Sequence, residues 1–296
     1  MSSERTALPG PAKYFFLRAL RPFSLSVTLV TCGLGITLAG HDGMLDVSRA
    51  VLVMIAGMLL QSAVNLFNDY ADVELWERSD GYYANNVLAM IRRNLLVAKI
   101  MAGLSVAIGL VLVFQAGWEL LVIGALGLAG GYFYTGQPIA YKNRGGGVFA
   151  VFLFTGVLMV VGSYVAVTGE WSYPVVLYSI PVSMISSMLL LANELRDVQD
   201  DAVNNIGTFT VRAGAPLAEL LYRTLAIGAL LYAWGLGFSG GMNFPWIMFV
   251  PALALKEPFQ ILKASKMAHQ RNILVKLPPV TGRYFVVFGI CMMLAI

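Results

Sequence analysis

The sequence has few charged residues, few histidines and few cysteines for its length. Only 12% of its 296 residues are Asp, Glu, Lys or Arg, whereas about a quarter is usual in soluble domains. A hydrophobic share of 58% and a mean hydropathy of +0.74 accompany this shortage, and together they exclude a soluble globular protein. The two cysteines, Cys32 and Cys291, lie at opposite ends of the chain, which argues against a disulfide framework. A lone His41 with no third ligand beside it argues against a histidine-based metal centre.

Long apolar runs take the place of the missing charge. A helix needs about 20 apolar residues to cross a bilayer, and this length predicts an all-α, polytopic membrane protein with nine spans. No cleavable signal peptide is expected, because Arg18 and Arg21 lead directly into a full-length span. The predicted spans are 23–40, 48–68, 95–115, 118–135, 147–168, 173–193, 217–238, 242–259 and 280–296.

The distribution of positive charge predicts how these spans are oriented. Of the 20 Lys and Arg residues, only Arg49 falls in a loop on the other side from the rest in the nine-span arrangement. The positive-inside rule therefore places the N-terminus and the even-numbered loops in the cytoplasm of a cell-membrane protein. The net charge of +4 is then a sign of topology and not of nucleic-acid binding.

Acidic residues are concentrated at the ends of two predicted spans. Asn65, Asp69 and Asp72 are spaced four and three apart, so they share one face of a continuing helix. The same spacing recurs 128 residues later at Asn193, Asp197 and Asp200. Because that displacement covers four spans, it predicts two parallel four-helix repeats followed by a ninth helix.

Carboxylates that meet at a membrane surface repel one another unless cations lie between them. Hard oxygen ligands of this kind suit Mg²⁺, which commonly shares its coordination between carboxylates and substrate phosphates. Lys142, Arg144 and Arg196 supply basic groups that phosphate oxygens need. The implied ligand is a diphosphate on a lipid tail, held at the cytoplasmic mouth of an apolar cavity.

Several motifs resemble the UbiA superfamily of membrane prenyltransferases. They are NDYAD at 68–72, NELRDVQDD at 193–201, the Arg21 and Pro22 pair, and the YTGQP…YK segment at 134–142. The run from Tyr134 to Gly214 is most similar to the 1,4-dihydroxy-2-naphthoate prenyltransferases of menaquinone (quinone) biosynthesis. The likeness implies one transmembrane domain over 1–296, in which 1–22 is an interfacial N-terminal segment.

The resemblance also implies a reaction and its residues. A polyprenyl diphosphate would bind through Mg²⁺, ionise, and be attacked by a small aromatic acceptor, with membrane lipid as the surroundings. Tyr134 would lie near the forming cation. The resemblance implies catalytic roles for Asp69, Asp72, Asp197 and Asp201, metal ligands at these four and Asp200, and diphosphate contacts at Asn65, Asn68, Lys142, Arg144, Asn193 and Arg196.

The sequence departs from the family pattern at three places. Trp76 stands where a third acid of the first motif is usual, so that Glu77 or Asp80 would have to replace it. Ile206 stands where the naphthoate branch has a lysine, and Val148 where it has a glutamate. The last two departures bear on the acceptor.

Two alternatives to naphthoate prenylation follow from the same residues. The first is a UbiA-type transferase with another acceptor, such as 4-hydroxybenzoate, homogentisate, a tetrapyrrole or a glycerol phosphate. The second is a non-enzymatic polytopic carrier that uses the acids as ion sites. A carrier would place its acids near the bilayer midplane, while the acids here end their spans. Prenyl length and oligomeric state leave no signal in the sequence.

Overall fold

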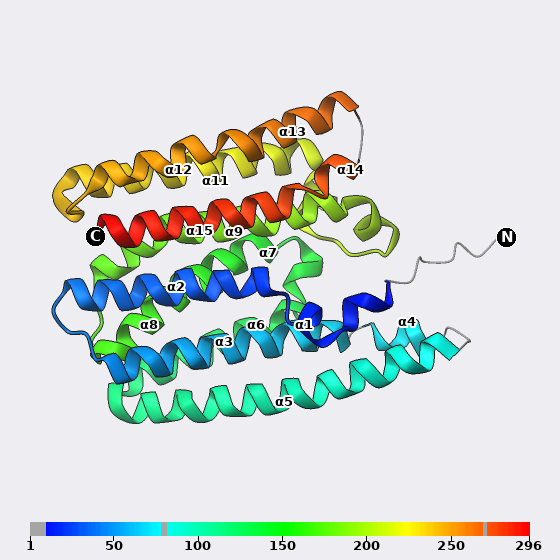
Figure 1. The fold of residues 1–296 in the computed structure, drawn as a ribbon, viewed down its shortest axis with the longest axis horizontal. Helices are drawn as coiled ribbons and strands as arrows, with labels where there is room; N and C mark the ends of the chain where they lie inside the picture. Colours follow the sequence, from blue (N-terminus) through cyan, green and yellow to red (C-terminus); the bar gives the residue numbers. More distant parts are fainter. Residues whose placement is uncertain (1–9, 71, 78–81, 269–270) are drawn as a thin grey trace.

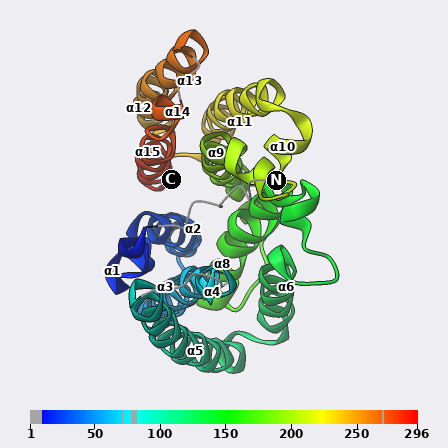
Figure 2. The ribbon, with the colours of Figure 1, turned by 90° about the vertical axis from the view of Figure 1, so that its right-hand side faces the viewer.

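The computed structural model describes residues 10–70, 72–77, 82–268 and 271–296, and these residues form helices and no strand. The long helices run side by side as one bundle, seen from the side in Figure 1 and along its axis in Figure 2. Among the described residues, seven helices are long and apolar enough to cross a membrane, and Trp118–Tyr134 forms a shorter apolar helix. The chain is an integral membrane protein.

The first half of the chain contains a short N-terminal segment and four long helices. The 3₁₀ turn η1 (Pro11–Tyr14) and α1 (Phe16–Ala19) precede α2 (Pro22–His41), α3 (Val47–Tyr70), α4 (Val73–Glu77), α5 (Tyr82–Ala116) and α6 (Trp118–Thr135). Pro22 occupies the first turn of α2, where a missing N–H group costs nothing.

The second half begins with a 3₁₀ turn, η2 (Tyr141–Arg144). A continuous helix follows, made of α7 (Gly147–Ala150), the π-helical η3 (Val151–Leu158) and α8 (Met159–Thr168). Next come α9 (Tyr173–Val203), α10 (Phe209–Ala213) and α11 (Ala215–Leu236) with its extension η4 (Gly237–Gly241). The chain closes with η5 (Pro245–Met248), α12 (Phe249–Ala254), α13 (Lys256–Ala268), α14 (Arg271–Leu274) and α15 (Leu277–Ala295).

The predicted spans all fall on helical segments, with different boundaries. The prediction of a single helix over 242–259 is wrong, because η5, α12 and α13 divide this region. Lys256 and Glu257 interrupt the apolar run there, and Pro251 and Pro258 lie in first turns of the new helices, where proline is tolerated. The arrangement as two four-helix repeats plus one helix stays a prediction.

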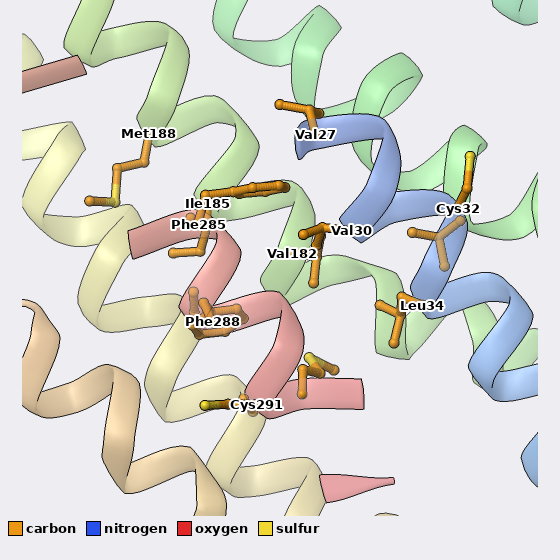
Figure 3. Close-up of a cluster of buried hydrophobic side chains, with 14 of the residues drawn as sticks. Val27, Val30, Cys32, Leu34, Val182, Ile185, Met188, Phe285, Phe288 and Cys291 are labelled. Atoms are coloured by element: carbon orange, nitrogen blue, oxygen red, sulfur yellow. The ribbon is translucent and has the colours of Figure 1, made fainter. Parts of the chain in front are cut away.

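The centre of the bundle is formed by α2, α9 and α15. Val30 of α2, Ile185 of α9 and Phe285 of α15 are buried in one apolar cluster (Figure 3). The outer surface is also apolar, with Phe114 97% exposed and Leu253 80% exposed. Exposed apolar side chains of this kind fit contact with lipid. The packed centre, in turn, holds the ends of the helices in fixed positions.

Candidate functional site

The two acidic clusters lie at the same end of the bundle. The first acidic cluster, Asp69 and Asp72, is at the end of α3, and the second acidic cluster, Asp197, Asp200 and Asp201, is in the last turns of α9. Both helices end toward the right of Figure 1, where α4 lies. The two helices α2 and α8 each pack against both α3 and α9, and so fix the two clusters relative to each other.

Basic side chains of the N-terminal segment neutralise the first acidic cluster. The guanidinium Nη2 of Arg21 lies 2.7 Å from Oδ1 of Asp69. The ammonium Nζ of Lys13 lies 2.5 Å from Oδ2 of Asp72 and 3.8 Å from Oδ1 of Asp69. Asp69 is fully buried, and its Oδ2 has no hydrogen-bond partner among the described residues. A buried carboxylate oxygen without a donor is costly, so this atom lacks a partner that a bound cation would supply.

Tyr14 connects the first acidic cluster to α4 and α5. Its hydroxyl donates to Oδ2 of Asp72 at 2.8 Å and accepts from Nε1 of Trp76 at 3.0 Å. Asn94 of α5 donates from Nδ2 to the backbone oxygen of Tyr14 at 2.9 Å. Burial, ahead of the charge of Asp72, raises the pKa of Tyr14 above the ordinary value of a phenol. The hydroxyl therefore stays protonated at neutral pH and keeps donating to Asp72.

The two asparagines of the first motif have different surroundings. Asn65 is buried, and its Nδ2 donates to the backbone oxygen of Leu20 at 2.8 Å and to Oγ of Ser24 at 2.6 Å. It therefore fastens α3 to the junction between α1 and α2. Asn68 is exposed, so its amide is accessible from solvent.

The second acidic cluster is more open than the first. Arg196 donates to Asp197 from Nε at 2.7 Å and from Nη2 at 2.5 Å, a two-pronged contact that suits the planar guanidinium group. Both side chains are about one-third exposed, at 33% and 35%. Asp200 is exposed, and Asp201 accepts from Oγ1 of Thr208 at 3.5 Å.

Glu194 adds a buried carboxylate one turn below this cluster. Its Oε2 accepts from the backbone N–H of Thr210 at 3.0 Å and from the hydroxyl of Thr210 at 3.1 Å, whereas its Oε1 has no partner among the described residues. A Cβ atom placed on Gly147 would lie 3.5 Å from that Oε1 and 3.7 Å from the hydroxyl of Tyr134. Lys142 is within electrostatic range of Glu194 and of Asp201. Glu194, Tyr134 and Lys142 thus belong to the surroundings of the second cluster.

Arg144 and Asn193 have partners outside the acidic clusters. Nη2 of Arg144 donates to the backbone oxygen of Pro138 at 2.8 Å. Nδ2 of Asn193 donates to the backbone oxygen of Leu189, within its own helix, at 2.9 Å. Of the two expected replacements for the third acid, Glu77 pairs with Arg92, with Oε1 lying 3.3 Å from Nη2, and Asp80 lies outside the described residues.

The carboxylate oxygens of the two clusters suit a hard metal ion that also binds a second ligand. No three acidic, histidine or cysteine side chains in the described part of the chain are close enough to hold a metal by themselves. Mg²⁺ does not need such a cage, since it binds through one or two carboxylates and completes its shell with phosphates and water. The unpartnered Oδ2 of Asp69 and the half-open carboxylate of Asp197 are suitable oxygen ligands.

Residues 28–277 match the family model described as the UbiA prenyltransferase family. The chain belongs to this family. Among curated UbiA relatives, 1,4-dihydroxy-2-naphthoate octaprenyltransferase of Bacillus subtilis is 27% identical over 281 residues, which cover 90% of this chain and 87% of the relative. The protein of the same name from Mycobacterium tuberculosis is 30% identical over 67% of this chain and 68% of the relative. The chain is therefore a prenyltransferase, and the alternative of a non-enzymatic carrier is set aside.

Solved UbiA structures share the fold. A digeranylgeranylglyceryl phosphate synthase superposes with a TM-score of 0.66 at 15% identity, covering 96% of this chain and 98% of that one. A UbiA homologue from Archaeoglobus fulgidus bound to GPP and Mg²⁺ gives a TM-score of 0.62 at 14% identity, covering 94% and 99%. At these identities the likeness shows a common UbiA fold.

The motifs gave no role to four residues that the structure places at the clusters. Lys13 and Tyr14 contact Asp72, Trp76 donates to Tyr14, and Glu194 lies in α9 three residues before Asp197. Lys13 and Tyr14 looked like parts of an interfacial anchor, and no periodicity connects residues that are 58 or 59 positions apart. Glu194 carried a usable signal, because a glutamate in an apolar helix turn is expensive to bury and is a functional candidate for that reason.

Proposed function

We propose that this UbiA prenyltransferase transfers an isoprenyl group from a polyprenyl diphosphate to an aromatic acceptor, 1,4-dihydroxy-2-naphthoate, in a Mg²⁺-dependent reaction at the cytoplasmic side of the membrane. The observation that carries the proposal is the position of two acidic clusters at one end of an apolar bundle. The names of the Bacillus and Mycobacterium relatives support the naphthoate acceptor, and the neighbour bound to GPP and Mg²⁺ supports the metal and the donor.

In this proposal the carboxylates hold the metal and the basic residues hold the diphosphate. The metal ligands are Asp69, Asp72, Asp197, Asp200 and Asp201. When bound, the metal stabilises negative charge on the diphosphate leaving group. Lys142 and Arg196 bind phosphate oxygens of the diphosphate. To do so, the side chain of Arg196 turns away from Asp197 and toward the ligand. Asn68 and Arg144, which are exposed, contact the diphosphate from the solvent side.

Tyr134 stabilises the allylic cation, and the buried apolar core keeps water away from it. An aromatic face stabilises a nearby cation through its quadrupole, and Tyr134 lies beside Glu194 and Gly147, below the second cluster. The diphosphate contacts predicted for Asn65 and Asn193 stay part of this proposal. The amide nitrogen of Asn65 already donates to Leu20 and Ser24, and that of Asn193 donates to Leu189 of its own helix. The apolar helices exclude water, which would otherwise trap the cation.

The test is a transfer assay with purified protein in lipid nanodiscs. Labelled prenyl diphosphates of several lengths are supplied with Mg²⁺ and a panel containing dihydroxynaphthoate, 4-hydroxybenzoate and homogentisate. We expect diphosphate release and a prenylated product with dihydroxynaphthoate, loss of both with EDTA, and recovery when Mg²⁺ is returned. Release with another acceptor would correct the acceptor, whereas no release with any acceptor would contradict the proposal.

A further inference from the structure

The two acidic clusters obtain their positive partners from different parts of the chain. Arg196 precedes Asp197 directly in α9, but the residue 128 positions earlier, beside Asp69, is Asn68. The first cluster therefore has no arginine of its own. Its cations, Lys13 and Arg21, come from the N-terminal segment, 48 to 59 residues away in the sequence.

Lys13 lies where a cation would neutralise both carboxylates of the first cluster. Its Nζ is 2.5 Å from Oδ2 of Asp72 and 3.8 Å from Oδ1 of Asp69. Arg21 contacts Asp69 alone among the acidic residues described. A divalent ion that used Asp72 would therefore meet the ammonium group at Oδ2, and the two cations would compete through like-charge repulsion.

The segment that carries Lys13 is fixed in position. Tyr14 is fully buried, with its ring edge-on to Trp76 at a centroid distance of 6.0 Å, and it holds hydrogen bonds to Asp72, Trp76 and Asn94. The side chain of Lys13 itself remains 36% exposed. Tyr14 can thus keep the backbone in place while the flexible lysine side chain turns outward to solvent.

We propose that Lys13 is a positioning residue of the first acidic cluster, whose ammonium group holds Asp69 and Asp72 together until a divalent metal takes its place. The inference rests on the proposed function, since it assumes that the first cluster binds metal. The N-terminal segment then competes with the metal for Asp72, and in the metal-free protein Lys13 compensates the charge of Asp72 beside the buried Asp69, which Arg21 also contacts.

The decisive measurement is the affinity for Mn²⁺, read by electron paramagnetic resonance without any diphosphate. Lys13→Met removes the competing charge and keeps the side-chain length. We expect Mn²⁺ to bind this variant about twofold to fivefold more tightly than the wild type, in keeping with a partly exposed ion pair. Arg18→Met is the matched control, because Arg18 is exposed on the same segment and pairs with no acid in the described part of the chain. Its affinity should equal that of the wild type.

An unchanged or weaker affinity of the Lys13→Met variant would overturn the inference while leaving the proposed function intact. Absence of Mn²⁺ binding in every variant, with and without inorganic diphosphate, would contradict both. The extent to which lysine amines of the wild-type protein are acetylated gives a second measurement, which does not depend on whether a variant folds. Adding Mn²⁺ should raise the labelling of Lys13 and leave that of the exposed Lys263 unchanged, and equal labelling of Lys13 in both conditions would count against the exchange.

Discussion

At the scale of single residues, two motifs with the same spacing have unequal surroundings. Asp69 is fully buried and contacts two cations, whereas the side chain of Asp197 is 35% exposed and pairs with one. Removing a charge from a buried pair strands its partners and costs several kcal/mol, but removing it from an exposed pair costs about 1 kcal/mol or less. A substitution at Asp197 therefore separates chemistry from folding better than one at Asp69.

Asp197→Asn should lower turnover by about a hundredfold or more, since it removes one charge that stabilises the leaving group through metal. The variant should keep its melting temperature in detergent within about 2 °C, because the lost ion pair is partly exposed. The measurements are prenyl transfer at saturating Mg²⁺ and thermal unfolding of the same preparation.

Asp46→Asn provides the comparison for this variant. Asp46 also pairs with an arginine, Arg49, but at the start of α3, the opposite end of that helix from Asp69. Its turnover should match the wild type. Near-normal turnover of Asp197→Asn would contradict the proposed metal role of that carboxylate.

At the scale of elements, hydropathy located most of the long apolar helices but missed where one of them begins. The third span was expected from residue 95, but α5 begins at Tyr82. Ala84, Val87 and Ile91 are buried against Tyr14 and Trp76, and their spacing is that of one helix face. Polar neighbours such as Asn85 and Arg92 lower the average hydropathy of this stretch, so a window that searches for membrane spans passes over an amphipathic helix.

Close helix packing explains several glycines and provides a test of the fold. A Cβ atom on Gly35 of α2 would lie 2.4 Å from the backbone oxygen of Val160 and 2.9 Å from Cβ of Ser163 in α8. A backbone oxygen cannot move away from the added methyl group as a flexible side chain could. Gly35→Ala should therefore force α2 and α8 apart and destabilise the protein by about 1–3 kcal/mol. Unfolding in mixed SDS micelles would measure the loss.

Gly103→Ala is the matched control, since a Cβ atom there meets nothing within 4 Å in α5. Alanine favours helix over glycine by up to about 1 kcal/mol, so this variant should be as stable as the wild type or more so. Equal stability of the two variants would mean that α2 and α8 are less closely packed than the structure shows.

At the scale of the whole molecule, the sequence predicted that the acids gather at one end and could not predict what surrounds them. Span length and the repeated spacing of Asp69 and Asp197 were enough for the first conclusion. The contact of Lys13 with Asp72 depends on how the N-terminal segment folds back over α3 and α4, and no local pattern records such a long-range contact. Trp76 illustrates the same limit, because its role as donor to Tyr14 is visible only in three dimensions.

The orientation of the bundle in the membrane is the prediction that belongs to this scale. Lys13, Arg21 and Arg196 pair with acids of the clusters, and Arg49 lies in the first turn of α3, at the opposite end of that helix from Asp69. The positive-inside rule therefore predicts that the clusters face the cytoplasm. Cysteines introduced at Leu45, which is 48% exposed between α2 and α3, and at Asn204, exposed after α9, report the two sides. A membrane-impermeant maleimide should label Leu45→Cys in intact cells and Asn204→Cys only after the membrane is opened.

The native Cys32 and Cys291 are buried, so labelling of the protein without introduced cysteines gives the background. The reverse pattern would put the diphosphate site on the outside, away from a cytoplasmic supply of substrate, and would reject the proposed orientation.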